Sequence, residues 1–398
     1  MNDQTNNSQS RRQFLGRSAA VLAATSVIPF HFGCSGNTPA ETVVADSSKP
    51  NSKFGGVQIG TITYSWRTMD GGLQNIIRYC KEANIGSIEL MSTDLETYLG
   101  APENPMQAMF ARGASRDPAN APGPPSPRPP DAANAPGPPP SPRPPDAPNA
   151  PNAAANPNNS QYIPAGSGYV RVPRQLTPEQ QAARDKYNED LKNWRIQLSL
   201  SKVEEARKLL EDNGIHVHIV KFSPAQWSDE EIDYAFKVAK AMGAKAVTEE
   251  ISLDAARKLA PFAEKHDMYV AFHNHMQYAE EGFSVNPILE VSPAVMLNFD
   301  AGHFYGSTGI HPNEILKKYH DRIYSIHIKD KTGPTAPEPN ANQVWGQGET
   351  PLEELLLLIK QEKWPIYCDI ELEYPVKSWS NPVKEVGICV NYARQILL

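Results

Sequence analysis

Several apolar segments of this 398-residue chain end in a carboxylate or an imidazole. In LNFDAGHFYG, residues 297–306, Leu297 and Phe299 are typical of a core, yet Asp300 follows at once and His303 comes three residues later. A turn would account for Asp-Ala-Gly but would not require a histidine. Because carboxylates and imidazoles together bind divalent metals and transfer protons, the pattern indicates metal-assisted proton chemistry.

The segments that carry these residues alternate with helical patterns. The predicted strands are, in order, GVQIGTIT, IGSIELM, IHVHIVKF, AKAVTEEI, MYVAFHNH, AVMLNFD, RIYSIHIKD and PIYCDIELEY, and one long helix is expected near residues 179–213. Repeated strand–helix units imply a parallel sheet, and eight of them in this length predict an α/β fold, a closed (β/α)8 TIM barrel. The alternative, a doubly wound open sheet, would need a glycine-rich phosphate loop after the first strand, and TITYSWRTMDGG is not one.

Side-chain parity predicts which residues point into this barrel. Alternate strand residues face the helices and are apolar, and the others face the interior. In the sixth strand Leu297 and Phe299 face the helices, which leaves Asp300 inside at the C-terminal rim; in the third strand Val217 and Ile219 are expected to face outward. The same reasoning brings seven charged or imidazole side chains to one end of the barrel: Glu89, His218, Glu250, His275, Asp300, His327 and Glu371.

Burying these charges without partners would be costly, and a divalent metal ion is the simplest remedy. The predicted ligands end strands along one side of the barrel: Glu250, Asp300, His327 and Glu371. Three carboxylates and one imidazole form an oxygen-rich site that favours Mn²⁺, with Mg²⁺, Co²⁺ or Zn²⁺ as alternatives. The sequence leaves open whether Glu249 replaces Glu250 and whether Glu373 replaces Glu371.

The motifs resemble the sugar phosphate isomerase/epimerase group of xylose isomerase-like barrels. The resemblance covers about residues 54–100 and 176–398 and is carried by FHNH (272–275), FDAGH (299–303), IHIKD (326–330), WGQGETP (345–351) and IELEY (370–374). It implies that Asp300, His327 and Glu371 bind the metal. The fifth-strand position where that group often has its second glutamate is His273 in this chain, a departure, and Glu250 on the fourth strand would take that role.

This combination favours a metal-dependent isomerase or epimerase of a sugar or cyclitol. Proton transfer next to a carbonyl would pass through a metal-stabilised enediolate, with Glu250 and Glu371 as the expected base and acid. Gly302 is expected to allow a tight turn that brings His303 to the substrate. The predicted contacts to the carbohydrate are Trp66, Glu89, His218, His273, His275, His303, Lys329 and Trp345.

Three other functions remain as alternatives. A lyase or dehydratase acting on a keto-sugar, a 3-keto-glycoside or an inosose would use the same enediolate and expel a group from the β carbon. A metal-dependent endonuclease of the same superfamily would need a basic face, and nucleic-acid binding is not favoured by a formal net charge of −7. A non-catalytic surface sugar-binding protein would differ from all of these in lacking bound metal.

Residues 1–45 are predicted to be an export signal and linker. Arg11 and Arg12 precede an apolar run from about residue 19 to residue 30, which resembles a twin-arginine signal. The expected partner is then the twin-arginine export machinery, and the expected location is the periplasm or cell surface. A lipid anchor attached at Cys34 is a further possibility for the exported protein. No later stretch offers the roughly 18 apolar residues of a membrane span.

Residues 101–177 are predicted to be a low-complexity insertion in a barrel domain of residues 54–398. Much of the chain's 37 prolines gathers there, and ANAPGPPSPRPPDA at 119–132 recurs as ANAPGPPPSPRPPDA at 133–147. Such a repeat cannot bury a core, so we expect a disordered segment, with a Pro-rich ligand for a partner as the alternative. Cys80, Cys368 and Cys389 are expected to form no disulfide, and homo-oligomerisation is left open.

Overall fold

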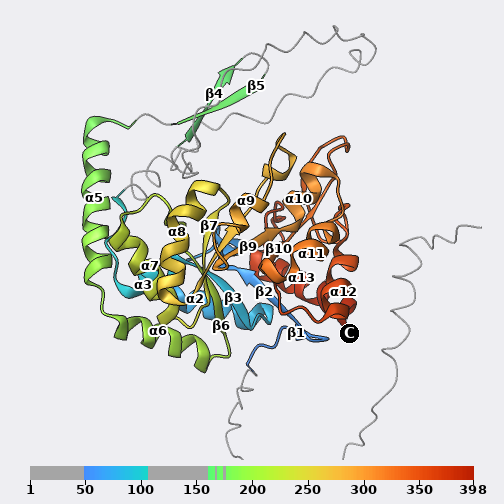
Figure 1. Cartoon of the computed structure of the whole chain (residues 1–398), viewed down its shortest axis with the longest axis horizontal. Coiled ribbons are helices and arrows are strands. Elements are labelled where there is room, and N and C mark those ends of the chain that lie inside the picture. The colour runs from blue at the N-terminus through green and yellow to red at the C-terminus, as the bar shows by residue number, and fades with distance from the viewer. Residues whose placement is uncertain (1–48, 106–159, 166–167, 174–175) are drawn as a thin grey trace, which may run out of the picture. The chain divides into compact units, whose positions relative to one another are not determined.

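The computed structural model describes residues 49–105, 160–165, 168–173 and 176–398. Eight parallel strands form a closed barrel surrounded by helices (Figure 1). The barrel strands are β2 Val57–Ile62, β3 Ser87–Met91, β6 His216–Lys221, β7 Ala246–Glu250, β8 Tyr269–His273, β9 Val295–Asp300, β10 Ile323–Ile328 and β13 Tyr367–Ile370. Because β2 pairs with both β13 and β3, the sheet closes on itself and the predicted TIM barrel is confirmed.

The helices cover the outside of the barrel and bury the outward strand residues, such as Val270, Leu297 and Ile326, in one apolar core. They are η2 Thr63–Trp66, α2 Leu73–Ala83, α3 Ser92–Leu99, α5 Pro178–Gln197, α6 Leu200–Asp212, α7 Asp229–Ala241, α8 Leu253–His266, η6 Gln277–Ala279, α9 Asn286–Leu289, α10 Ala301–Thr308, α11 Asn313–Tyr319, η7 His320–Arg322, α12 Leu352–Glu362 and α13 Pro382–Leu397. The short strand β1 Lys53–Phe54 pairs antiparallel with β2. Two further short strands, β11 Asp330–Lys331 and β12 Asn342–Gln343, pair antiparallel with each other.

A β-bulge changes the predicted parity of β6. The register between β3 and β6 shifts between Ile88 and Glu89. As a result Ile219, which was expected to face outward, joins the cluster inside the barrel with Ala271 and Met296. A bulge moves every later side chain to the other face, and Lys221 at the end of β6 therefore points inward.

Two helical predictions also need correction. The long helix expected near residues 179–213 is interrupted, since α5 ends at Gln197 and α6 begins at Leu200. The turn expected after Asp300 is the first turn of α10, whose His303 backbone N–H donates to Asp300 Oδ1 over 2.6 Å. Gly302 lies inside this helix and is needed for space rather than for a turn, because a Cβ there would overlap Lys329.

Some predictions fall on residues outside the described part of the chain. These are the twin-arginine signal with Cys34 and the Pro-rich repeat at 119–147. Within the predicted insertion the structure describes an unpredicted antiparallel pair, β4 Ser160–Ala165 and β5 Gly168–Pro173. No helix in the described ranges is long and apolar enough to cross a membrane.

Candidate metal centre

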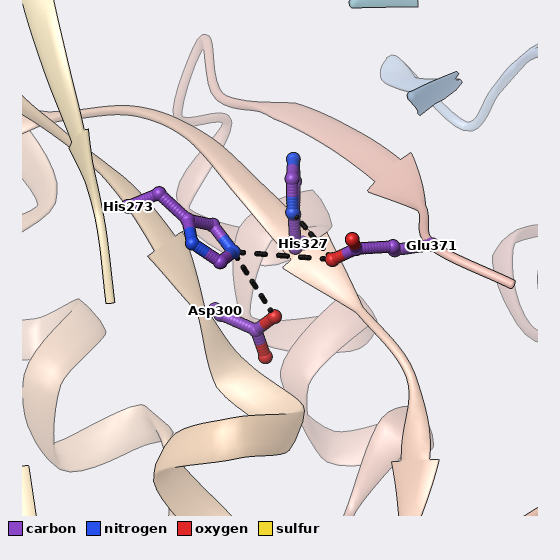
Figure 2. A group of neighbouring side chains, drawn as sticks. All are labelled: His273, Asp300, His327 and Glu371. Atoms are coloured by element: carbon purple, nitrogen blue, oxygen red, sulfur yellow. Dashed lines mark hydrogen bonds and ion pairs between the residues drawn. The ribbon is translucent and has the colours of Figure 1, made fainter. Parts of the chain in front are cut away.

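Four buried side chains meet at the C-terminal end of the barrel (Figure 2): His273, Asp300, His327 and Glu371. They come from the ends of β8, β9, β10 and β13, and one ligand-type atom of each lies within 4.8 Å of the others. His273 Nε2 is 3.3 Å from Asp300 Oδ2 and 3.9 Å from Glu371 Oε2. His327 Nδ1 is 2.8 Å from the same Glu371 oxygen. The group contains three of the four predicted ligands, with His273 in place of Glu250.

The donor atoms of this group fit a divalent ion. His273 Nε2 is buried without a hydrogen bond to the described residues, and Asp300 Oδ2 lies 3.3 Å from it, which is costly unless something else binds the imidazole. Lys329 Nζ lies at ion-pair distance, 2.8 Å from Asp300 Oδ2 and 2.7 Å from Glu371 Oε2. Because each carboxylate oxygen has two lone pairs, both carboxylates can contact Lys329 and an ion together.

His327 is held between two carboxylates. Its Nδ1 faces Glu371, and its Nε2 is 2.8 Å from Glu89 Oε2. Burial would lower the pKa of His327, but the negative charges of Glu371 and Glu89 raise it well above its usual value. Glu89 is fully buried, so the structure does not support the substrate contact predicted for it.

Glu250 lies at the rim and belongs to a second group with His273 and His275. Its Oε2 is 3.5 Å from His273 Nδ1 and 3.1 Å from His275 Nε2, and its Oε1 accepts from Lys221 Nζ over 2.8 Å. Burial raises the pKa of Glu250, but Lys221 and the two imidazoles lower it more strongly. Because the Lys221 ammonium already supplies a positive charge, this second group does not require an ion.

The two rival carboxylates lie outside the group of four. Glu249 accepts from the backbone N–H groups of Ala225 over 2.6 Å and Glu250 over 2.7 Å, so it holds the loop after β6. Glu373 Oε2 accepts from Lys329 Nζ over 2.8 Å. Glu371, rather than Glu373, is therefore the last-strand carboxylate of the group.

His303 lies beside the centre without being part of it. Its Nε2 is 3.9 Å from Asp300 Oδ2 and 3.7 Å from Glu373 Oε2. Burial lowers its pKa to about 3; Asp300 opposes this change, while Lys329 and Lys331 add to it. His303 is therefore a neutral imidazole at physiological pH.

Two motif residues serve to position the centre. Asn274 Oδ1 accepts from the Asp300 backbone N–H over 3.0 Å, and its Nδ2 donates to the Asp300 carbonyl over 3.2 Å. Asp330 accepts from the backbone N–H groups of Gly346, Gly348 and Thr350, which fastens the WGQGETP segment to the end of β10. The FHNH and IHIKD motifs thus contain residues that fix backbone as well as candidate ligands.

His218 was predicted at the substrate end of the barrel, and the structure corrects this. The side chain points inward as expected but lies deeper, fully buried and stacked on Tyr367. Its Nε2 is 2.7 Å from Asp369 Oδ2 and its Nδ1 is 2.8 Å from Ser87 Oγ. Parity gives the side of a strand on which a residue lies but not its depth.

The predicted tryptophan platforms are also corrected. Trp66 is 2% exposed and packs against Tyr79, and Trp345 is 6% exposed and packs against Tyr392. Both indoles belong to the apolar core and offer no face for stacking on a sugar.

Sequence reasoning missed Lys221, which contacts Glu250, and Asn298, whose Nδ2 lies 3.2 Å from His327 Nε2. Lys221 carries the signal that identified the other residues, a charge at the end of an apolar strand. The bulge in β6 concealed it, because uninterrupted alternation turns Lys221 outward.

Comparison with known proteins agrees with this architecture. The sequence model of the family described as xylose isomerase-like TIM barrel matches residues 185–387, just over half of the chain. The chain belongs to the xylose isomerase-like TIM barrel family. A stretch of 79 residues is 39% identical to an inosose dehydratase of Clostridium botulinum (strain Eklund 17B / Type B) and covers 18% of this chain. The match spans only 25% of that curated relative.

Solved structures similar to this family member include two whose names state an enzyme activity. One is a sugar phosphate isomerase/epimerase from Parabacteroides distasonis ATCC 8503, with a TM-score of 0.45 and 12% identity over 86% of this chain and 96% of that chain. The other is the probable 3-DHS dehydratase AsbF from Bacillus anthracis, with a TM-score of 0.47 and 11% identity over 84% of this chain and 99% of that chain.

Proposed function

We propose that this protein is a metal-dependent isomerase or epimerase that removes the proton next to a carbonyl of a sugar or cyclitol. The proposal rests on the buried group of two imidazoles and two carboxylates, in which the nitrogens of His273 form no hydrogen bond to the described residues. The group lies at the C-terminal barrel end, where enzymes of this fold carry their active sites. When bound, a divalent ion polarises the carbonyl and stabilises the negative charge that develops on proton loss.

Four atoms would hold the ion: His273 Nε2, Asp300 Oδ2, His327 Nδ1 and Glu371 Oε2. This donor set contains one more imidazole than the sequence suggested. Imidazole suits Zn²⁺, Co²⁺ and Fe²⁺, while Mg²⁺ prefers oxygen ligands. Among the ions considered, the set therefore favours Zn²⁺, Co²⁺ or Mn²⁺ over Mg²⁺.

Glu250 is the best-placed base. Its Oε2 lies between the imidazoles of His273 and His275, at 3.5 Å and 3.1 Å, and the side chain is 36% exposed at the barrel mouth. The Lys221 ammonium keeps Glu250 ionised, as a base must be before it takes a proton. Glu371, on the other side of His273, is the second candidate for proton transfer. The neutral His303 and the half-exposed His275 are placed to hydrogen-bond substrate hydroxyls.

A dehydratase is the second candidate function, and the local similarity to an inosose dehydratase favours it. The same proton is removed, but the electron pair then forms a carbon–carbon double bond and expels a β hydroxide. That hydroxide takes a proton and leaves as water. His275, at the rim beside Glu250, would be placed to supply this proton.

The test is solvent exchange in D₂O with the full chain, loaded separately with Zn²⁺, Co²⁺ and Mn²⁺ or stripped by a chelator. Keto-sugars and inososes are screened by proton NMR. Metal-dependent loss of the α-proton signal with a new isomer supports the proposal, whereas loss of water with a conjugated enone supports the dehydratase. Binding of a sugar without exchange would favour the non-catalytic alternative. Export, predicted from residues 1–45, is part of the proposal and is checked by cell fractionation.

A further inference from the structure

We propose that Glu89 is a positioning residue that fixes the His327 tautomer and so turns the Nδ1 lone pair toward Asp300, Glu371 and His273. The inference rests on the metal centre of the proposed function. It assigns to Glu89 a task in ion binding without direct contact to the ion.

Glu89 is held from three sides inside the barrel. Its Oε1 accepts from Thr248 Oγ1 over 2.9 Å. Its Oε2 accepts from Asn298 Nδ2 over 2.8 Å and lies 2.8 Å from His327 Nε2. Asn298 is itself oriented by Ser325, whose hydroxyl donates to Asn298 Oδ1 over 2.7 Å. Glu89 is fully buried.

The arrangement decides where the imidazole proton lies. A neutral imidazole has one N–H and one lone pair, and the partner of one nitrogen sets the role of the other. Both nitrogens of His327 face a carboxylate, Glu89 at Nε2 and Glu371 at Nδ1. When an ion binds Glu371 it displaces the proton from Nδ1, and the ionised Glu89 holds the proton that remains on Nε2, so that the Nδ1 lone pair faces the ion. Asn298 Nδ2 is a donor only 3.2 Å from His327 Nε2. Without Glu89 that amide would favour the opposite tautomer, with N–H on Nδ1 and no lone pair for an ion.

A carboxylate behind the ligand nitrogen also raises the basicity of the imidazole. Loss of such a partner typically lowers metal affinity by about 10- to 100-fold. The isosteric Glu89→Gln keeps an oxygen acceptor for Nε2–H but removes the charge, whereas Glu89→Leu removes both.

The control is Asp369→Asn, which alters a similar buried pair, Asp369 with His218; Asp369 is the strand partner of His327, but its side chain forms no hydrogen bond or ion pair with the group of four in the described part of the chain. Metal-free full-length variants are compared by thermal unfolding, and Zn²⁺ and Co²⁺ affinities by calorimetry. The visible spectrum of bound Co²⁺ reports ligand geometry. We expect affinity to fall about 100-fold in Glu89→Leu and about 10-fold in Glu89→Gln, with a changed Co²⁺ spectrum. Asp369→Asn should lower the unfolding temperature while keeping affinity and spectrum.

Unchanged affinity and an unchanged Co²⁺ spectrum in a folded Glu89→Gln would overturn the inference. An equal loss of affinity in Asp369→Asn would also overturn it, since the effect would then be general. If Glu89→Leu does not fold, the Gln variant carries the test. If the proposed function is wrong, wild-type protein will bind metal but exchange no α proton. In that case the expected loss of metal affinity in the two Glu89 variants, without loss in Asp369→Asn, would still support the role of Glu89. Wild-type protein that binds neither ion overturns both.

Discussion

The candidate metal centre contains two imidazole–carboxylate pairs that look alike and differ in their surroundings. We call His327 with Glu89 the inner pair and His273 with Glu250 the outer pair. Both oxygens of Glu89 are hydrogen-bonded and its side chain is fully buried. Glu250 Oε2 lies at longer range, 3.5 Å from His273 Nδ1, and its side chain is 36% exposed. This difference in surroundings underlies the two proposed roles, positioning for Glu89 and proton transfer for Glu250.

The barrel explains the difference. The inner pair joins β3 to β10 across the interior, where both side chains are buried. The outer pair joins β7 to the adjacent β8, whose last residues are in register as Glu250 and His273. Strand ends open onto the barrel mouth, so the outer carboxylate alone is placed to meet a substrate.

The largest effect is expected from Asp300, which contacts His273 and Lys329 at the point between the two pairs. Asp300→Ala should lower metal affinity about 1,000-fold or more, beyond the loss typical of an outer partner. Asp300→Asn keeps the acceptor for the His303 backbone N–H and separates loss of the helix cap from loss of the ligand. Calorimetric titration with Zn²⁺ measures both; wild-type affinity in Asp300→Ala would refute the ligand assignment.

Glu250→Gln sharpens the contrast between the pairs. Removal of a general base typically costs about 100- to 10,000-fold in rate, so turnover should fall by at least about 100-fold. Metal affinity should change by less than about tenfold, because Glu250 is not one of the four ligands. Parallel measurement of exchange rate and metal content checks this. A metal loss as large as that of Asp300→Ala would return Glu250 to the ligand set.

Gly302→Ala tests the space that Lys329 needs beside the centre. A Cβ there would lie 2.7 Å from the Lys329 carbonyl oxygen and overlap its side chain. We expect a loss of about 1–3 kcal/mol in the free energy of unfolding, as for other overpacked sites. The matched control is Gly387→Ala in α13, where the nearest atom, Ala83 Cα, is 3.7 Å away and a gain of up to about 1 kcal/mol is expected. Chemical denaturation distinguishes them, and equal effects would refute the packing argument.

The smallest effect is expected from His303→Ala. His303 is a neutral imidazole near the centre but outside the ligand group. Loss of one substrate hydrogen bond should raise KM about tenfold, corresponding to roughly 1.4 kcal/mol, and leave metal affinity unchanged. His320→Ala, which removes a ring stacked on Trp364, is the remote control. Metal loss in His303→Ala would place this imidazole among the ligands.

The sequence predicted the barrel and three of the four centre residues because alternation is uninterrupted in β9 and β13 and, beyond the irregularity between Ile323 and Ser325, in the rest of β10. Leu297 and Phe299 pack outward, which is enough to turn Asp300 inward. The sequence prediction missed Lys221 because a β-bulge leaves no signal in the amino-acid composition. It misplaced His218 because side-chain alternation gives the face of a strand but not the depth of a residue in the barrel. Trp66 was misassigned because burial depends on which helix covers a loop. His273 appeared as a departure from the expected glutamate, and only geometry shows its ring beside Asp300.

The most direct test of the account is an anomalous diffraction experiment on crystals soaked with Zn²⁺ or Co²⁺. The account predicts one strong peak about 2.0–2.3 Å from His273 Nε2, Asp300, His327 Nδ1 and Glu371, with Glu89 and Glu250 each behind an imidazole and out of coordination range. A peak bound by Glu250 and His275, or one coordinated through His327 Nε2, would contradict it.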